Sequence, residues 1–138
     1  MSKSPVKSPV KSPVKSIAMA ALAAGLIAVP AFGHHSHAMF DRDTTLTVTG
    51  TVAALDWTNP HVWLHVDTTD EEGEAVRWSL ELGSPAQIAR RGWRPRTVSP
   101  GDVVSVALNP LRDGGQIGSL VGIALPDGTH LGDEEYLN

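Results

Sequence analysis

Three histidines within four residues, His34, His35 and His37, are the strongest chemical signal in the sequence. Neutral imidazole nitrogen is a suitable ligand for copper, zinc and nickel. A histidine-rich tract is compositional, however, and a solvated N-terminal leader also accounts for it. The tract therefore leaves two hypotheses open, a transition-metal site with copper as the leading ion, or an ordinary leader.

The position of these histidines favours the metal hypothesis, because they follow an expected secretion signal. Residues 1–16 carry four lysines and no acid, and residues 17–29 form an uncharged apolar run. This run has the length of a signal h-region and is too short to span a bilayer. Small residues then allow cleavage after Gly33 or after Ala31. We expect a helical signal peptide over 1–33, which contacts the membrane only transiently, and a mature protein that is periplasmic or secreted.

Either cleavage leaves a terminus that can chelate copper. A chain that begins at His34 presents its amine and its imidazole to one ion. A chain that begins at Phe32 presents the amine, two amide nitrogens and the His34 imidazole, a square-planar set favoured by Cu(II) and Ni(II). His61 is a further candidate ligand. His65 is expected to fill a half-buried face instead, because four residues along a strand span about 13 Å.

The four tryptophans provide an alternative function without a metal. Trp78 alternates with apolar residues and is expected in the core, and Trp93 is expected as a plug beneath a helix. Trp63 shares a strand face with His61 and could serve as an aromatic platform for a partner protein or a glycan. The residues expected to form this platform are Trp57, Asn59 and Trp63.

Composition argues against several other classes of protein. Four of the 11 basic residues are the lysines of the signal, so seven Arg face 15 acids in the mature part, a net charge of about −8 with His neutral. This balance disfavours nucleic acid as a partner. The acidic segment 67–74 lacks the spacing of a calcium loop and is expected to be a hairpin turn. The sequence offers no assignable serine, histidine and acid arrangement, cysteine nucleophile or glycine-rich phosphate loop, and we expect no enzymatic activity.

Alternating apolar residues predict the elements that position these side chains. The expected strands are Thr45–Leu55, His61–Asp67, Ala75–Leu82, Val103–Leu108 and Ser119–Leu125. Ser84, Pro85 and Gln87 meet the chemical requirements for starting a helix, which is expected to end at Arg91. The expected core consists of Val48, Val52, Val62, Leu64, Val66, Trp78, Leu80, Val104, Val106, Leu120 and Ile123.

Five strands with one short helix between the third and the fourth indicate an all-β fold, a small barrel like the oligonucleotide/oligosaccharide-binding fold. A small β-sandwich is the alternative. With no cysteine, the domain must rely on its core rather than on disulfides. The expected organisation is a signal peptide at 1–33, a His-rich leader at 34–44, the barrel at 45–131 and a flexible tail at 132–138.

Several motifs together resemble the DUF6152 family of exported bacterial proteins of unknown function. The most specific are the His-His-Ser start at His34 and the segment Trp-Thr-Asn-Pro-His-Val-Trp at 57–63. The resemblance covers nearly the whole mature chain and implies export, a compact β domain and no assigned activity. Family members commonly carry Phe after His-His-Ser, so His37 departs from the pattern and its imidazole is not implied as a shared ligand.

Overall fold

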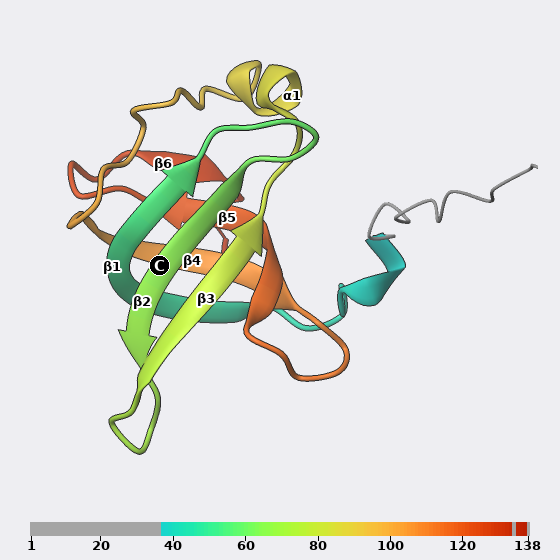
Figure 1. The fold of residues 1–138 in the computed structure, drawn as a ribbon, viewed down its shortest axis with the longest axis vertical. Helices are drawn as coiled ribbons and strands as arrows, with labels where there is room; N and C mark the ends of the chain where they lie inside the picture. The colour runs from blue at the N-terminus through green and yellow to red at the C-terminus, as the bar shows by residue number, and fades with distance from the viewer. Residues whose placement is uncertain (1–36, 134, 138) are drawn as a thin grey trace, which may run out of the picture. The chain divides into compact units, whose positions relative to one another are not determined.

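A computed structural model describes residues 37–133 and 135–137, which form a closed β-barrel (Figure 1). The expected signal peptide, His34 and His35 lie outside these described residues. Within them, no helix has both the length and the apolar character needed to cross a membrane. The elements in chain order are η1 (His37–Met39), β1 (Leu46–Asp56), β2 (Trp63–Thr69), β3 (Ala75–Glu81), α1 (Pro85–Ala89), β4 (Val103–Pro110), β5 (Ile117–Ala124) and β6 (His130–Gly132).

The strand order is β3-β2-β1-β4-β5-β6, and a second pairing of β3 with β5 closes the first five strands into a ring. This closing pair is parallel, with Ser79 opposite Ile117 and Glu81 opposite Ser119, whereas the other named strand pairs are antiparallel. The expected five-stranded barrel with one short helix after the third strand is confirmed. Closure removes the free edges that a flat sheet would expose.

Alternation in β2 and β3 produces the inward and outward faces of the wall. Leu64 pairs with Leu80, and both are fully buried inside the ring. Their strand neighbours Trp63 and Glu81 pair with each other on the outside. Thus one ladder supplies both the core and the face that carries polar side chains.

The short helix α1 begins where the capping chemistry predicts. The Ser84 side chain accepts a hydrogen bond from the Gln87 backbone N–H, and the Gln87 side chain accepts one from the Ser84 N–H. The helix ends at Ala89, slightly before the expected Arg91. Its Ile88 is buried, and so is Trp93 just beyond it, which confirms Trp93 as an apolar plug near the helix.

The barrel interior holds most of the expected core. Val48, Trp78 and Leu120 differ, because they are only partly buried and pack against the core rather than within it. The buried hydrophobic residues are Phe40, Val52, Val62, Leu64, Val66, Leu80, Leu82, Ile88, Trp93, Val98, Val104, Val106, Ala107, Leu108 and Ile123.

A bulge in β1 changes which residues face outward. Val52 pairs with Val66 but Ala54 pairs with His65, so Ala53 is an extra residue on the β1 side. The alternation reverses after this point, and Leu55 packs on the core. Asp56, which strict alternation would place inward with Val52, lies opposite Trp63 on the outer face.

The fold extends past the expected barrel boundaries of 45 and 131 at both ends. Phe40 is buried and bridges to Leu111, although it falls in the segment expected to be a leader. The strand β6 pairs with β5 outside the ring, and Thr47 donates a hydrogen bond to the carbonyl of Tyr136 in the expected flexible tail. These contacts come from tertiary partners, which alternation along a short segment does not indicate.

Candidate functional site

The outer face of β1, β2 and β3 carries a cluster of polar and aromatic side chains, and the sequence alone predicted only some of them. In the ladder, Trp63 lies between Asp56 of β1 and Glu81 of β3. Two residues further along β2, His65 lies opposite Ser79. We call Asp56, Trp63, His65, Ser79 and Glu81 the outer-face cluster.

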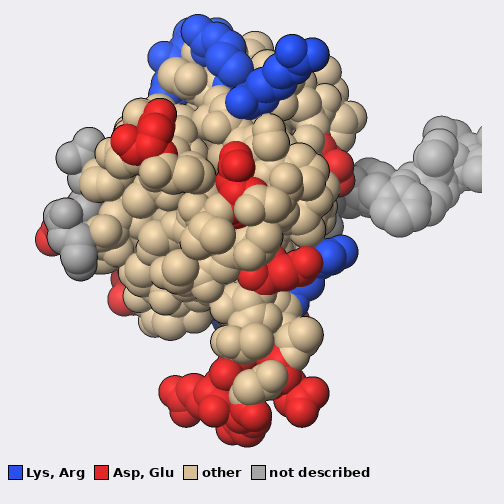
Figure 2. All heavy atoms as spheres, turned by 90° about the vertical axis from the view of Figure 1, so that its left-hand side faces the viewer, with Lys and Arg blue, Asp and Glu red and all other residues tan. Residues whose placement is uncertain are grey.

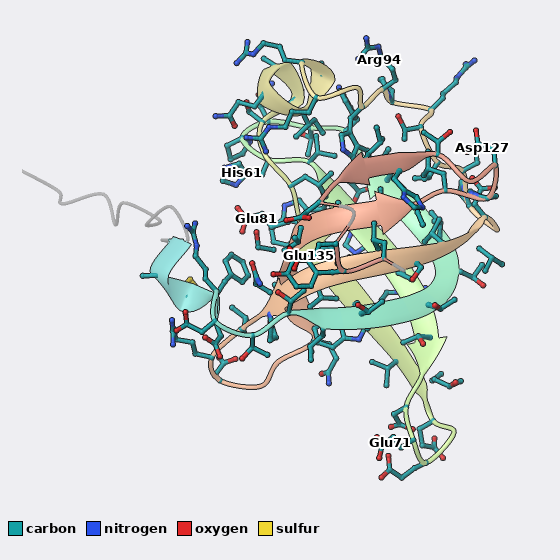
Figure 3. All side chains as sticks on the ribbon, turned by 180° about the vertical axis from the view of Figure 1, so that it is seen from behind. His61, Glu71, Glu81, Arg94, Asp127 and Glu135 are labelled. Atoms are coloured by element: carbon teal, nitrogen blue, oxygen red, sulfur yellow. The ribbon has the colours of Figure 1, made fainter. Side chains whose placement is uncertain are left out.

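His61, just before β2, contacts this cluster through Glu81. Its Nδ1 forms an ion-pair contact with Glu81 Oε1 (Figure 3). The Glu81 side chain is only 7% exposed and that of His61 is 29% exposed. The second carboxylate oxygen, Oε2, is buried and has no hydrogen-bond partner among the described residues. A buried carboxylate therefore holds one nitrogen of His61 and leaves Nε2 as the nitrogen available for a ligand.

His65 differs because both of its ring nitrogens have partners. Nδ1 lies 3.0 Å from Ser79 Oγ, and Nε2 lies 3.2 Å from Asp56 Oδ2. These contacts tie β1, β2 and β3 together on the outside of the barrel. His65 thus fills a half-buried face, as expected, and has no ring nitrogen left for a metal.

Ser79, His65 and Asp56 follow the order of a nucleophile, a base and an orienting acid. Acyl transfer by such a group also needs hydrogen-bond donors for the developing oxyanion. The backbone N–H of Ser79 instead donates to the carbonyl of Gln116, at 3.0 Å, because Ser79 sits inside a paired strand. The arrangement therefore supports a structural cross-link better than a nucleophilic site.

The segment that leads to the N-terminal histidines is attached to the barrel. The Arg112 N–H donates to the Met39 carbonyl at 3.0 Å, and the Asp41 N–H donates to the Pro110 carbonyl at 2.8 Å. The Arg112 side chain also reaches the Ala38 carbonyl and the Asp41 carboxylate. Of the three histidines in the tract, only the backbone of His37 is described, in η1.

Strand pairing relates this attachment to Glu81. Asn109, next to the attached Pro110, pairs with Ser119 of β5, and Ser119 pairs in turn with Glu81. Neighbouring strands lie about 4.8 Å apart, so Asn109 and Glu81 are separated by about 10 Å across β5. The described segment that follows the histidine tract therefore joins the barrel two strands away from Glu81.

The expected aromatic platform is divided between the inside and the outside of the wall. Trp57 is partly buried and packs against the core. Asn59 is exposed in the connection before β2, and Trp63 is half-buried on the outer face. The bulge at Ala53 explains the position of Trp57, because the residue after the outward Asp56 turns inward.

Charged residues gather at opposite ends of the barrel (Figure 2). Arginines follow α1 at one end, whereas the β2–β3 hairpin carries the acidic segment at the other. In that hairpin, Asp70 Oδ1 accepts hydrogen bonds from the N–H groups of Glu72 and Glu74, which is the chemistry of a turn. Hydrogen bonds from the Arg77 guanidinium hold the pKa of Asp67 below its usual 3.8.

Across the described residues, no group of three or more His, Asp or Glu side chains is arranged to hold a metal ion.

Glu81, Asp56 and Ser79 are the cluster members that sequence reasoning missed. Nothing in the alternation distinguishes Glu81 from any other outward residue, because its partners come from the register with β2 and β5. Asp56 depends on the bulge, which no turn residue in the sequence marks. His61, Trp63 and His65 did carry a signal, since they alternate within one strand pattern.

No curated protein matches the sequence. A family model matches residues 21–120, which include residues 21–29 of the apolar run, the histidine tract, and the chain from β1 into β5. The chain therefore belongs to DUF6152, a family of unknown function.

Proposed function

We propose that the protein is an exported, periplasmic or secreted binding module that holds a transition metal, with copper as the preferred ion. The observation that carries the proposal is the contact between His61 Nδ1 and the buried carboxylate of Glu81. Histidines that bind metals commonly donate their second ring N–H to a carboxylate, which fixes the tautomer and makes the ligating nitrogen more basic. His61 has this arrangement with Nε2 as the ligand, whereas His65 does not.

The histidine tract would supply the remaining nitrogen ligands. His37 is three positions after His34, and an extended chain of three residue steps spans at most about 10 Å. This reach is comparable to the distance of about 10 Å across β5 between Asn109 and Glu81. The proposed ligand set thus consists of His34, His35 and His37 together with His61.

Nitrogen-rich ligand sets without cysteine favour Cu(II) over the hard cations. A cleaved amine at His34 or Phe32 would add a further nitrogen, and this feature separates a metal site from a leader that merely contains histidines. Glu81 Oε2 also supports a ligand at this position. A buried acceptor without a partner costs about 1–3 kcal/mol, and a donor brought by the ligand would relieve that cost.

The experiment compares two forms of the mature protein in a Cu(II) competition titration. One form begins at the cleavage site found from the intact mass of the exported protein. The other carries an additional Met-Ala, which leaves every imidazole in place and moves the amine away. We expect one tightly bound Cu(II) in the first form and loss of most of that affinity in the second.

Equal affinity in the two forms would rule out the amine as a ligand while leaving an imidazole site. Absence of binding in both would leave the histidines as a solvated leader and would overturn the proposed function.

A further inference from the structure

The two ends of the barrel are closed differently. At the end that carries α1, Ile88, Trp93 and Val98 are buried and join the core. At the end that carries the β2–β3 hairpin (Figure 1), a cavity of about 370 Å³ remains. A volume of this size lies in the range of small-molecule sites, which often occupy the mouths of β-barrels. We call this cavity the barrel mouth; its lining residues are Thr47, Val48, Thr49, Thr68, Thr69, Asp70, Val76, Trp78 and Gln116.

Trp78 provides an aromatic surface in the barrel mouth. It pairs with Val66, which is fully buried, so it faces inward, yet it is only partly buried itself. An indole in this position offers an apolar face to a ligand and a polar N–H at its edge. The apolar neighbours Val48 and Val76 complete this side of the cavity.

The other side of the barrel mouth is polar, and part of it is not used by the fold. Thr68 donates its hydroxyl to the Thr49 carbonyl, and Asp70 Oδ1 caps the hairpin turn. In contrast, the Gln116 amide and Asp70 Oδ2 have no hydrogen-bond partner among the described residues, and both residues line the cavity. They offer an amide and a carboxylate oxygen to a ligand.

We infer that the barrel mouth binds a neutral sugar ring, as a second site that is independent of the proposed metal site. A pyranose has an apolar C–H face that can stack on Trp78 and hydroxyl groups that both donate and accept hydrogen bonds. Gln116 and Asp70 provide the matching amide and carboxylate. The lining contains a carboxylate and no Lys or Arg, and acidic residues of the hairpin adjoin it, which disfavours an anionic ligand.

The test is a titration of the mature protein with glucose and with N-acetylglucosamine, followed by the NMR signals of the tryptophan indole N–H groups. We expect the Trp78 signal to shift and the Trp63 signal to stay unchanged. Glucuronate and choline serve as anionic and cationic comparisons. We expect the protein to bind both of them more weakly than the neutral sugars.

Gln116→Ala removes an amide that the fold does not use, and Asp70→Asn keeps the oxygen that caps the turn while replacing Oδ2, so both variants should remain folded. Each should weaken sugar binding about three- to tenfold, as expected for one lost hydrogen bond. Thr51→Val, an exposed β1 residue outside the cavity, is the matched control and should bind like the unchanged protein.

A shift of Trp63 in place of Trp78, binding of choline or glucuronate in preference to the sugars, or no shift with any sugar would overturn the inference. Sugar binding that neither variant weakens would overturn it as well. Because these experiments contain no metal, their failure would leave the copper proposal standing.

Discussion

Nδ1 of His61 meets Glu81 Oε1 on the outside of the barrel, where the carboxylate is almost completely buried in the wall. Four residues further along the chain, both ring nitrogens of His65 have partners, Ser79 and Asp56. Two histidines of one sequence pattern thus have different chemistry, because one has a nitrogen available for a ligand and the other does not.

The first prediction concerns Glu81→Gln. The amide keeps the shape of the side chain but removes the negative charge beside Nδ1 of His61. We expect Cu(II) affinity to fall about 10- to 100-fold, the usual effect of losing a carboxylate behind a ligating histidine.

Competition titration measures this change, and circular dichroism checks that the variant is folded. Glu74→Gln, on the exposed hairpin, is the control and should bind copper like the unchanged protein. Undiminished affinity in Glu81→Gln would show that Glu81 has a structural role only.

The second prediction concerns Phe40, which is 3% exposed although it precedes the first strand. Phe40→Ala should lower the free energy of unfolding by about 3–5 kcal/mol, because it removes a buried aromatic ring. Met39→Ala is the control, since that side chain is 37% exposed. Urea unfolding measures both, and equal midpoints would mean that the fold begins only at β1.

The third prediction concerns Gly50, where β1 passes close to β2. A Cβ at this position would lie 2.7 Å from Val66 Cγ1 and closer still to the Asp67 carbonyl oxygen. Gly50→Ala should therefore destabilise the barrel by about 1–3 kcal/mol through overpacking.

Gly115→Ala is the matched control, because a Cβ there meets its nearest neighbours at 3.5 Å, an ordinary contact distance. Thermal or urea unfolding separates the two variants. A stability loss of the same size in both would show that the approach of β1 to β2 is not the cause.

The fourth prediction is a pH dependence at the exposed pair of Asp67 and Arg77. The guanidinium lies 2.6 Å from Asp67 Oδ1 and lowers the pKa of this carboxyl in the folded state. The unfolded chain therefore takes up a proton first as the pH falls. The stabilisation is present above the ordinary pKa of 3.8 and is lost as the pH falls through the lower folded value.

Urea unfolding between about pH 5 and pH 2, the range over which such a group titrates, should show a smaller loss of stability for Asp67→Asn than for the unchanged protein. Glu72→Gln, on the nearby hairpin turn, is the control. NMR titration of the Asp67 carboxyl gives the folded pKa directly, and a value above 3.8 would contradict the direction expected here.

Local chemistry was sufficient to predict most of the barrel. Alternation located the five ring strands, and the Ser84 capping box located α1, because these patterns depend on residues near one another in sequence. The three-residue strand β6 has no such pattern and forms only because β5 offers an edge. Phe40 is comparable, since its burial depends on Leu111 far along the chain.

The candidate site was harder to predict than the fold. The histidines were visible as residue types, but the difference between His61 and His65 depends on which side chains the register brings beside them. Glu81 reaches His61 from β3, and Asp56 reaches His65 only because the bulge at Ala53 reverses the alternation. Without the strand register, a single sequence does not show which side chains lie beside each histidine.

The most direct test of the proposed metal site is Cu(II) affinity in His61→Ala beside His65→Ala, each in the mature protein with its native terminus. We expect His61→Ala to weaken binding at least about tenfold, the lower limit seen when a metal site loses such support. We expect folded His65→Ala to retain the affinity of the unchanged protein, because both nitrogens of His65 already contact Ser79 and Asp56. Full affinity in His61→Ala, or a greater loss in His65→Ala, would contradict the assignment of His61 as the ligand on the barrel.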